Sequence, residues 1–114
     1  MAVANKPGDE WTTVTDESAI RIQFDTPGKD EFVGTYLGHD LVQGEYDYVL
    51  FRGTDGKLYS LSNSYKLSQA FGSGDGETEG KISEGTMCRL VYVKDVPMGS
   101  GRNPMKDIRV DTKA

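Results

Sequence analysis

Apolar and polar residues alternate along several short segments of this chain, as they do in half-buried β-strands. The clearest segment is 18–24, where Ile20, Ile22 and Phe24 share one face and Arg21 and Gln23 share the other. Further strands are predicted at 31–37, 45–52, 57–61, 86–94 and 106–112. The Asp-Gly pair at 55–56 predicts a tight turn that joins two of these strands into a hairpin.

One segment has helical spacing instead of alternation. Leu67, Ala70 and Phe71 fall on one face of a short helix over 65–71, with Ser62 or Asn63 as its N-cap and a glycine-rich stop after it. The segments 38–44 and 95–104 contain turn-forming residues and are expected to be loops.

The order of these elements predicts the fold class. We expect an all-β protein, with a five-stranded OB-fold Greek-key barrel, one short helix between strands 3 and 4, and an extra N-terminal strand at 18–24. Residues 1–17 predict a flexible acidic N-terminal arm, 18–112 the OB-fold domain and 113–114 a tail. The usual ligand of an OB-fold is a nucleic-acid strand or an oligosaccharide.

Length and composition narrow the class further. The 114 residues suit one domain, and no stretch approaches the ~20 apolar residues that cross a bilayer. The N-terminal residues lack the basic and apolar regions of a signal peptide. The single cysteine, Cys88, allows neither an internal disulfide nor a structural zinc site. These features predict a protein of a reducing cytoplasm without a membrane partner.

The net charge of −5 argues against simple non-specific binding to polyanions. Its distribution is uneven, because residues 1–80 carry 6 basic and 14 acidic side chains, whereas residues 81–114 carry 7 basic and 4 acidic ones. A local basic groove can therefore bind an anion while acidic segments lie beyond the Debye length of ~8 Å. A solvated surface of ordinary mixed charge is the alternative.

Tyrosines concentrate in the middle strands. Tyr46 and Tyr48 are two residues apart and so share a strand face with Arg52. Further candidates for a base-stacking platform with a cationic rim lie on the partner and neighbouring strands: Lys57, Tyr59, Tyr36 and Tyr92. Such a platform stacks bases of any sequence, since every base has a π-face. The alternative, which stays open, is that several of these rings pack the interior.

Candidate phosphate contacts are concentrated in the C-terminal third. The loop before the last strand carries Arg102, Asn103 and Lys106, which are donors suited to phosphates or base edges, and Arg89 and Lys94 lie on the strand before it. In OB-folds this loop borders the ligand cleft. An ordinary exposed hairpin loop remains the alternative.

The sequence contains little that indicates catalysis. His39, the only histidine, is expected in an exposed loop, and Cys88 is expected in the core. The acidic residues lack the spacing of a metal site or of a glycosidase pair. We therefore expect no enzyme, no catalytic residue, no metal and no cofactor.

Four strings of the sequence resemble small phage-encoded OB-fold proteins that bind single-stranded DNA: YVLFR at 48–52, GKLYSL at 56–61, SYKL at 64–67 and GRNPMKD at 101–107. The resemblance covers about residues 31–112. It implies a role in phage DNA replication or recombination, in the cytoplasm of an infected bacterial host. Cellular members of the wider group end in an acidic tip that recruits partners, whereas this chain ends in Asp-Thr-Lys-Ala.

The expected function is therefore sequence-tolerant binding of single-stranded DNA, with bases stacked on tyrosines and phosphates held by arginine and lysine. A homodimer, and replication proteins that contact the acidic arm, stay open as further partners. One alternative is a protein-interaction or virion-structural module on the same barrel that binds no nucleic acid. Another is an enzyme or inhibitor that captures a small anionic ligand such as a nucleotide.

Overall fold

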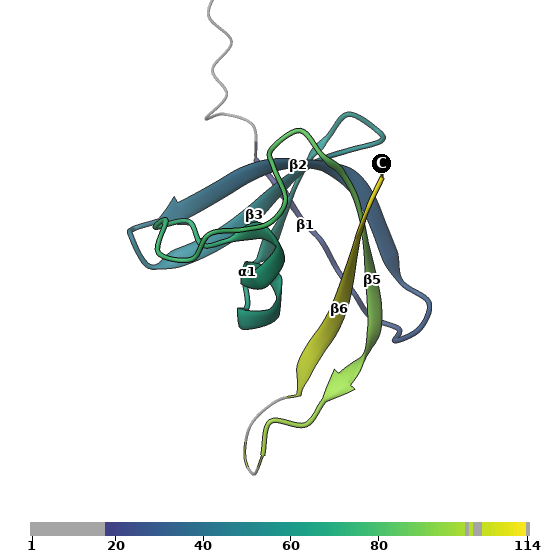
Figure 1. The fold of residues 1–114 in the computed structure, drawn as a ribbon. Coiled ribbons are helices and arrows are strands. Elements are labelled where there is room, and N and C mark those ends of the chain that lie inside the picture. The colour runs from purple at the N-terminus through teal and green to yellow at the C-terminus, as the bar shows by residue number, and fades with distance from the viewer. Residues whose placement is uncertain (1–17, 100, 102–103, 114) are drawn as a thin grey trace, which may run out of the picture.

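The structure is a computed structural model that describes residues 18–99, 101 and 104–113 (Figure 1). It contains the elements β1 (Ile20–Arg21), β2 (Glu31–Val42), β3 (Tyr46–Gly53), β4 (Leu58–Ser62), α1 (Tyr65–Phe71), β5 (Met87–Val96) and β6 (Met105–Thr112). The predicted arm at 1–17 lies outside the described residues, as do Arg102 and Asn103.

The strands form one six-stranded mixed sheet in the order β1-β4-β3-β2-β5-β6. The β1–β4 pair is parallel and the other four pairs are antiparallel. The all-β class is confirmed, as is the helix between the third and fourth of the five expected main strands. Closing this sheet into a barrel would require its two end strands, β1 and β6, to pair. Within the described residues they do not, so the sheet is open and the OB-fold barrel is not confirmed.

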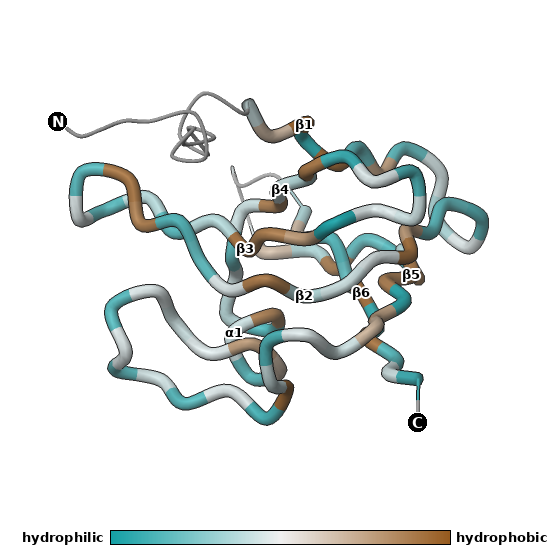
Figure 2. The backbone as a smooth tube through the Cα atoms, turned by 90° about the horizontal axis from the view of Figure 1, so that it is seen from above, coloured by the Kyte–Doolittle hydropathy of each residue, from teal (hydrophilic) through white to brown (hydrophobic). Residues whose placement is uncertain are grey.

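The prediction of a loop at 38–44 is wrong, because β2 continues to Val42. The register of β2 against β3 shifts between Tyr36 and Gly38, where Gly38 has φ 122°. Such a bulge bends a strand without ending it. Gln43 and Gly44 then make the turn, both with positive φ, and the Glu45 amide donates to the Val42 carbonyl at 3.0 Å. The β2–β3 hairpin therefore extends well beyond the rest of the sheet (Figure 2).

The helix α1 is capped by Ser64, whose hydroxyl accepts from the Leu67 amide at 3.2 Å, rather than by the predicted Ser62 or Asn63. The predicted glycine stop is confirmed at Gly72, which has φ 79°. Two helical side chains, Leu67 and Phe71, enter the core formed by the inner face of the sheet. The other buried apolar members of this core are Ile22, Phe24, Tyr36, Val49, Phe51, Leu61, Cys88, Leu90 and Tyr92.

Candidate nucleic-acid interface

The outer face of β3 holds the first part of the predicted platform. Val49 and Phe51 point inward and are fully buried, so Tyr48 and Arg52 point outward. Tyr46 begins the strand with the same parity and is 54% exposed. The structure thus places Tyr46, Tyr48 and Arg52 on one outward-facing row.

Arg21 joins this row from another part of the chain. Parallel pairing of β1 with β4 sets Arg21 beside Ser60, and its guanidinium carbon lies 4.8 Å from the centre of the Tyr48 ring. A cation over an aromatic face at this distance is attracted to the ring, typically by about 0.5–1 kcal/mol at an exposed site. Alternation indicated that Arg21 points outward, but only the β1–β4 pairing shows that it meets Tyr48.

Tyr59 lies on the opposite face, which corrects the prediction of a single platform. The turn contains three residues, because the Gly53 amide donates to the Lys57 carbonyl and the Gly56 amide donates to the Gly53 carbonyl, each at 2.9 Å. This register sets Tyr59 opposite Phe51 rather than beside the outward row. Its ring packs 5.0 Å from the ring of Phe32.

The Tyr59 hydroxyl donates to a carboxylate oxygen of Asp55 at 2.6 Å. This hydrogen bond raises the pKa of the Tyr59 phenol and lowers that of the Asp55 carboxyl. The contact ties the ring to its own turn. Tyr59 is therefore part of the hairpin structure and does not share a surface with Tyr48.

Tyr36 and Tyr92 are core residues, exposed by only 4% and 2%. The Tyr36 hydroxyl donates to the Phe71 carbonyl at 3.1 Å, and the Tyr92 hydroxyl donates to Asp95. The hydrogen bond to Asp95, together with burial, raises the pKa of Tyr92 to about 12. Their expected place on a stacking platform is wrong for this structure, because the sheet folds both rings inward.

Across the sheet, the outward-facing neighbour of Arg52 is Thr35 on β2, and the neighbour of Thr35 is Met87 on β5. The next outward row runs from Val33 through Arg89 to Asp111 on β6. Two of the predicted phosphate contacts, Arg52 and Arg89, therefore lie on the same outer face, on strands separated only by β2. Arg52 Nη1 donates to the Gly56 carbonyl at 3.1 Å.

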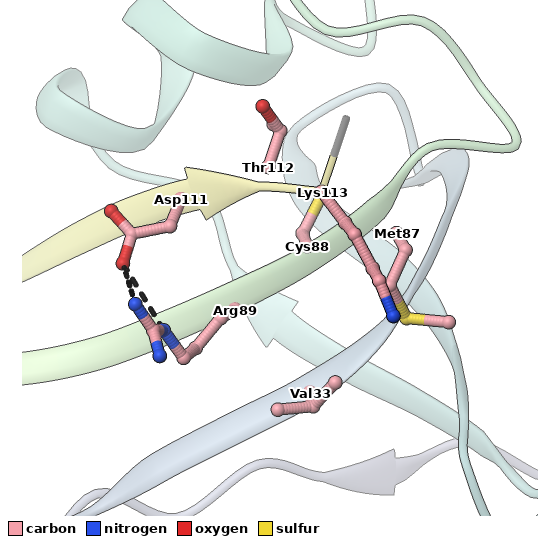
Figure 3. A pocket seen from close by; sticks show the side chains of 7 residues that line it. All are labelled: Val33, Met87, Cys88, Arg89, Asp111, Thr112 and Lys113. Atoms are coloured by element: carbon pink, nitrogen blue, oxygen red, sulfur yellow. Dashed lines mark hydrogen bonds and ion pairs between the residues drawn. The ribbon is translucent and has the colours of Figure 1, made fainter.

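Arg89 borders a shallow groove of about 320 Å³ on this face (Figure 3). Val33 and Met87 contribute its apolar part, and Arg89, Asp111 and Lys113 contribute its charges. Asp111 accepts from Arg89 Nη2 at 2.8 Å and from Arg109 Nη2 at 3.2 Å, and these two hydrogen bonds lower the pKa of the Asp111 carboxyl. Because two arginines share one carboxylate, this cluster keeps a net positive charge.

The other predicted cations are dispersed. Lys57 is exposed in the β3–β4 turn. Lys94 is exposed on β5 opposite Asp107, and Lys106 lies on β6 with its ammonium 5.3 Å from the centre of the Tyr92 ring. These three do not join the outward rows that carry Arg52 and Arg89.

His39 is not in an exposed loop, contrary to the sequence prediction. It lies on β2, where its Nδ1 is 2.8 Å from Asp47 Oδ1 and its Nε2 is 2.9 Å from the Phe71 carbonyl oxygen. Both ring nitrogens face oxygen atoms of other elements. This ring ties the β2–β3 hairpin to the C-terminal end of α1.

Asp47 is the centre of the same polar cluster. Its Oδ2 accepts from Asn63 Nδ2 at 2.8 Å and from the Gly74 amide at 2.7 Å. Burial alone raises the pKa of this carboxyl, but the hydrogen bonds from Asn63, Gly74 and His39 outweigh it and the pKa is lowered. The cluster had no sequence signal, because its members are brought together by the bulge in β2 and the return of the chain after α1.

Cys88 is buried in the core as predicted, and burial raises the pKa of its thiol. Among the described residues, no group of three or more His, Cys, Asp or Glu side chains is arranged to hold a metal ion. In the same part of the chain, no helix has the length and apolarity needed to span a membrane.

Comparison with known proteins found no matching protein-family model, no matching curated protein and no matching solved structure.

Proposed function

We propose that this protein binds single-stranded DNA with little sequence preference, and that it acts in phage DNA replication or recombination in the cytoplasm of an infected bacterial host. The observation that carries the proposal is the outward surface of β3, where Tyr46 and Tyr48 lie two residues apart and Arg21 lies over the Tyr48 ring. We name Arg21, Tyr46, Tyr48 and Arg52 the outer row.

The outer row combines the two interactions that a single strand needs. Stacking on an aromatic side chain contributes about 1–3 kcal/mol per base and tolerates any base. Arginine adds cation–π stacking and donors for phosphate oxygens. A base that inserts beside Tyr48 also meets the Arg21 guanidinium, which is held there before the ligand arrives.

The element order supports an OB-type architecture as part of this proposal. OB-folds bind oligonucleotides on the face of their second and third strands. In the five-strand frame these strands are β3 and β4, and the outer row lies on β3 and beside β4. An open sheet of this order would be a variant in which β1 occupies the free side of β4.

The test uses fluorescence anisotropy with a labelled oligothymidine at low salt. Loss of two stacking rings at about 1–3 kcal/mol each predicts that Tyr46→Ala with Tyr48→Ala weakens binding by about 30-fold or more. Tyr65→Ala is the matched control, because Tyr65 is 76% exposed on α1, away from the outer row. Equal affinity of the double variant and the control would refute the outer row as the stacking surface.

A protein-interaction or virion-structural module is the second candidate. The β2–β3 hairpin favours it, because Leu41 and Val42 are 36% and 37% exposed near the tip and Tyr46 follows on the other strand. An arm-mediated contact with replication proteins is compatible with either function. A parent protein that binds no oligothymidine at low salt, but binds a protein partner, would favour this candidate.

A further inference from the structure

The strand β6 has one edge without a partner strand. Among the described strands it pairs only with β5, and it ends the sheet (Figure 1). Along its other side lies a cleft of about 540 Å³ that separates it from α1 and that includes Asp107, Ile108, Arg109 and Val110 in its lining. An unpaired strand of this length is a template for pairing with another chain.

The pairing with β5 determines which backbone groups face this edge. The Lys113 amide donates to the Met87 carbonyl at 3.0 Å, so residues 113, 111 and 109 form the hydrogen-bonded pairs with β5. The amides and carbonyls of Ile108, Val110 and Thr112 therefore point away from β5, toward the open edge.

We propose that a second copy of this chain pairs with β6 through its own β6, antiparallel, about a two-fold axis at Val110. Edge-to-edge pairing brings Val110 opposite Val110 and Ile108 opposite Thr112, and forms about six backbone hydrogen bonds, two for each of the three facing pairs. The two sheets become one continuous sheet across the axis. The proposal is independent of nucleic-acid binding.

Charge selects this register from the alternatives. The outward side chains at this edge alternate in sign: Asp107, Arg109, Asp111 and Lys113. A two-fold axis at Arg109 would set Arg109 against its own copy and Asp107 against Asp111, which repel. An axis at Val110 sets Arg109 opposite Asp111 and Asp107 opposite Lys113, each twice, so every outward charge meets its opposite.

Axes at Ile108 and at Thr112 also have the correct backbone direction. The axis at Thr112 makes one kind of complementary pair, Asp111 with Lys113. The axis at Ile108 pairs Asp107 with Arg109 but sets Asp111 opposite the apolar Met105 and leaves Lys113 without a facing residue in β6. It therefore has half the complementary pairs of the axis at Val110. Registers that pair an even-numbered residue with an odd-numbered one are excluded. In them, the free amides and carbonyls of one copy would face residues whose backbone groups are already bonded to β5.

From α1, Lys66, Gln69 and Ala70 line the cleft beside this edge, together with Lys81 from the segment that follows, and Lys66 makes an ion pair with the strand. The Lys66 ammonium lies 3.0 Å from Asp107 Oδ1, and the lysine side chain is 47% exposed. In the dimer, Lys113 of the second copy would approach the same carboxylate from the edge. A solvent-exposed lysine can turn aside at small cost, since exposed ion pairs contribute little.

Sedimentation equilibrium of the pure protein without nucleic acid tests the proposal, over about 1 µM to 1 mM and at low salt. The parent is expected to dimerise weakly, because an edge-strand interface is small. Lys113→Asp turns two attractive pairs into repulsive ones and should weaken the dimer by about 10-fold or more, and Asp107→Lys should do the same. Combining Asp107→Lys with Lys113→Asp restores opposite charges and should restore dimerisation.

Lys57→Asp is the matched control, since Lys57 is exposed in the β3–β4 turn and those strands do not adjoin β6. Circular dichroism of each variant checks that the fold is kept. A parent that stays monomeric over the whole range would overturn the proposal. So would a Lys113→Asp variant that dimerises as tightly as the parent, or a double variant that does not recover. Binding of oligothymidine is measured separately, so failure here leaves the proposed function standing.

Discussion

The Asp47 carboxylate makes three hydrogen bonds that join separate parts of the chain, which makes its replacement by asparagine a sharp test of the fold. The bonds reach Asn63, the Gly74 amide and His39, at 2.7 to 2.8 Å. Asparagine has almost the same shape but offers only one acceptor oxygen. Its amide nitrogen would face either the Gly74 amide or a protonated His39 nitrogen, which are both donors.

The size of the effect follows from these contacts. A hydrogen bond to a charged group contributes about 1.5–3 kcal/mol, and an unpaired buried donor adds its own cost. With at least one bond lost and the others weakened, Asp47→Asn should lower the free energy of unfolding by about 2–4 kcal/mol. For a domain of this size the melting temperature should fall by about 10–25 °C.

Thermal and urea unfolding followed by circular dichroism measure the change. Asp40→Asn is the matched control, because Asp40 is an exposed carboxylate on β2, the partner of Asp47's strand β3 in the same hairpin, and it should change stability by less than about 0.5 kcal/mol. Both variants remove one negative charge, so their difference reports the buried contacts rather than net charge.

The pH dependence supplies a second readout of Asp47. Its pKa is lower in the folded state than the ordinary value of 3.8, so its stabilising contribution is complete above about pH 4 and is lost as the pH falls through the folded pKa. The gap in stability between parent and Asp47→Asn should therefore be constant near neutral pH and shrink in acid. A variant as stable as the parent at pH 7 would refute the proposed cluster.

Two further predictions concern the core. The hydrogen bond to Asp95 and burial raise the pKa of Tyr92 to about 12, so Tyr92 should stay protonated near pH 10 and stabilise the fold there. That contribution should be lost as the pH rises toward 12. Phenolate absorbance measures the titration, and six tyrosines that titrate together near pH 10 would contradict the prediction. Gly34→Ala should lower the free energy of unfolding by about 1–3 kcal/mol, because the new Cβ would lie 2.7 Å from the Phe32 ring and 2.9 Å from the Arg52 carbonyl oxygen. Denaturant unfolding measures the change. An unchanged denaturation midpoint would show that β2 and β3 are not so close.

The elements themselves were largely predictable from the sequence. Alternation and helical spacing located the main strands and α1 to within a few residues, because local burial of one face dominates those patterns. The hairpin around residues 55–56 and the stop at Gly72 followed from glycine chemistry. The end of β2 was not predictable from the sequence, because a bulge at Gly38 leaves the same local signal as a loop.

The face on which each tyrosine lies was much less predictable. A two-residue turn at 55–56 would have set Tyr59 opposite Arg52, on the outward row, whereas the observed three-residue turn sets it opposite Phe51. One residue in a turn therefore moves a ring to the other side of the sheet. The contact of Arg21 with Tyr48 depends on pairing between distant strands, which no local pattern encodes.

The central claim is that the outer row binds a single strand of DNA, and the salt dependence of parent affinity tests it most directly. If Arg21, Arg52 and Arg89 neutralise three phosphates, the slope of log affinity against log salt should be about −2 for oligothymidine. We predict tight binding at low salt with that slope, and weaker binding to duplex DNA of equal length. An affinity for oligothymidine that is undetectable at low salt, or independent of salt, would contradict the account.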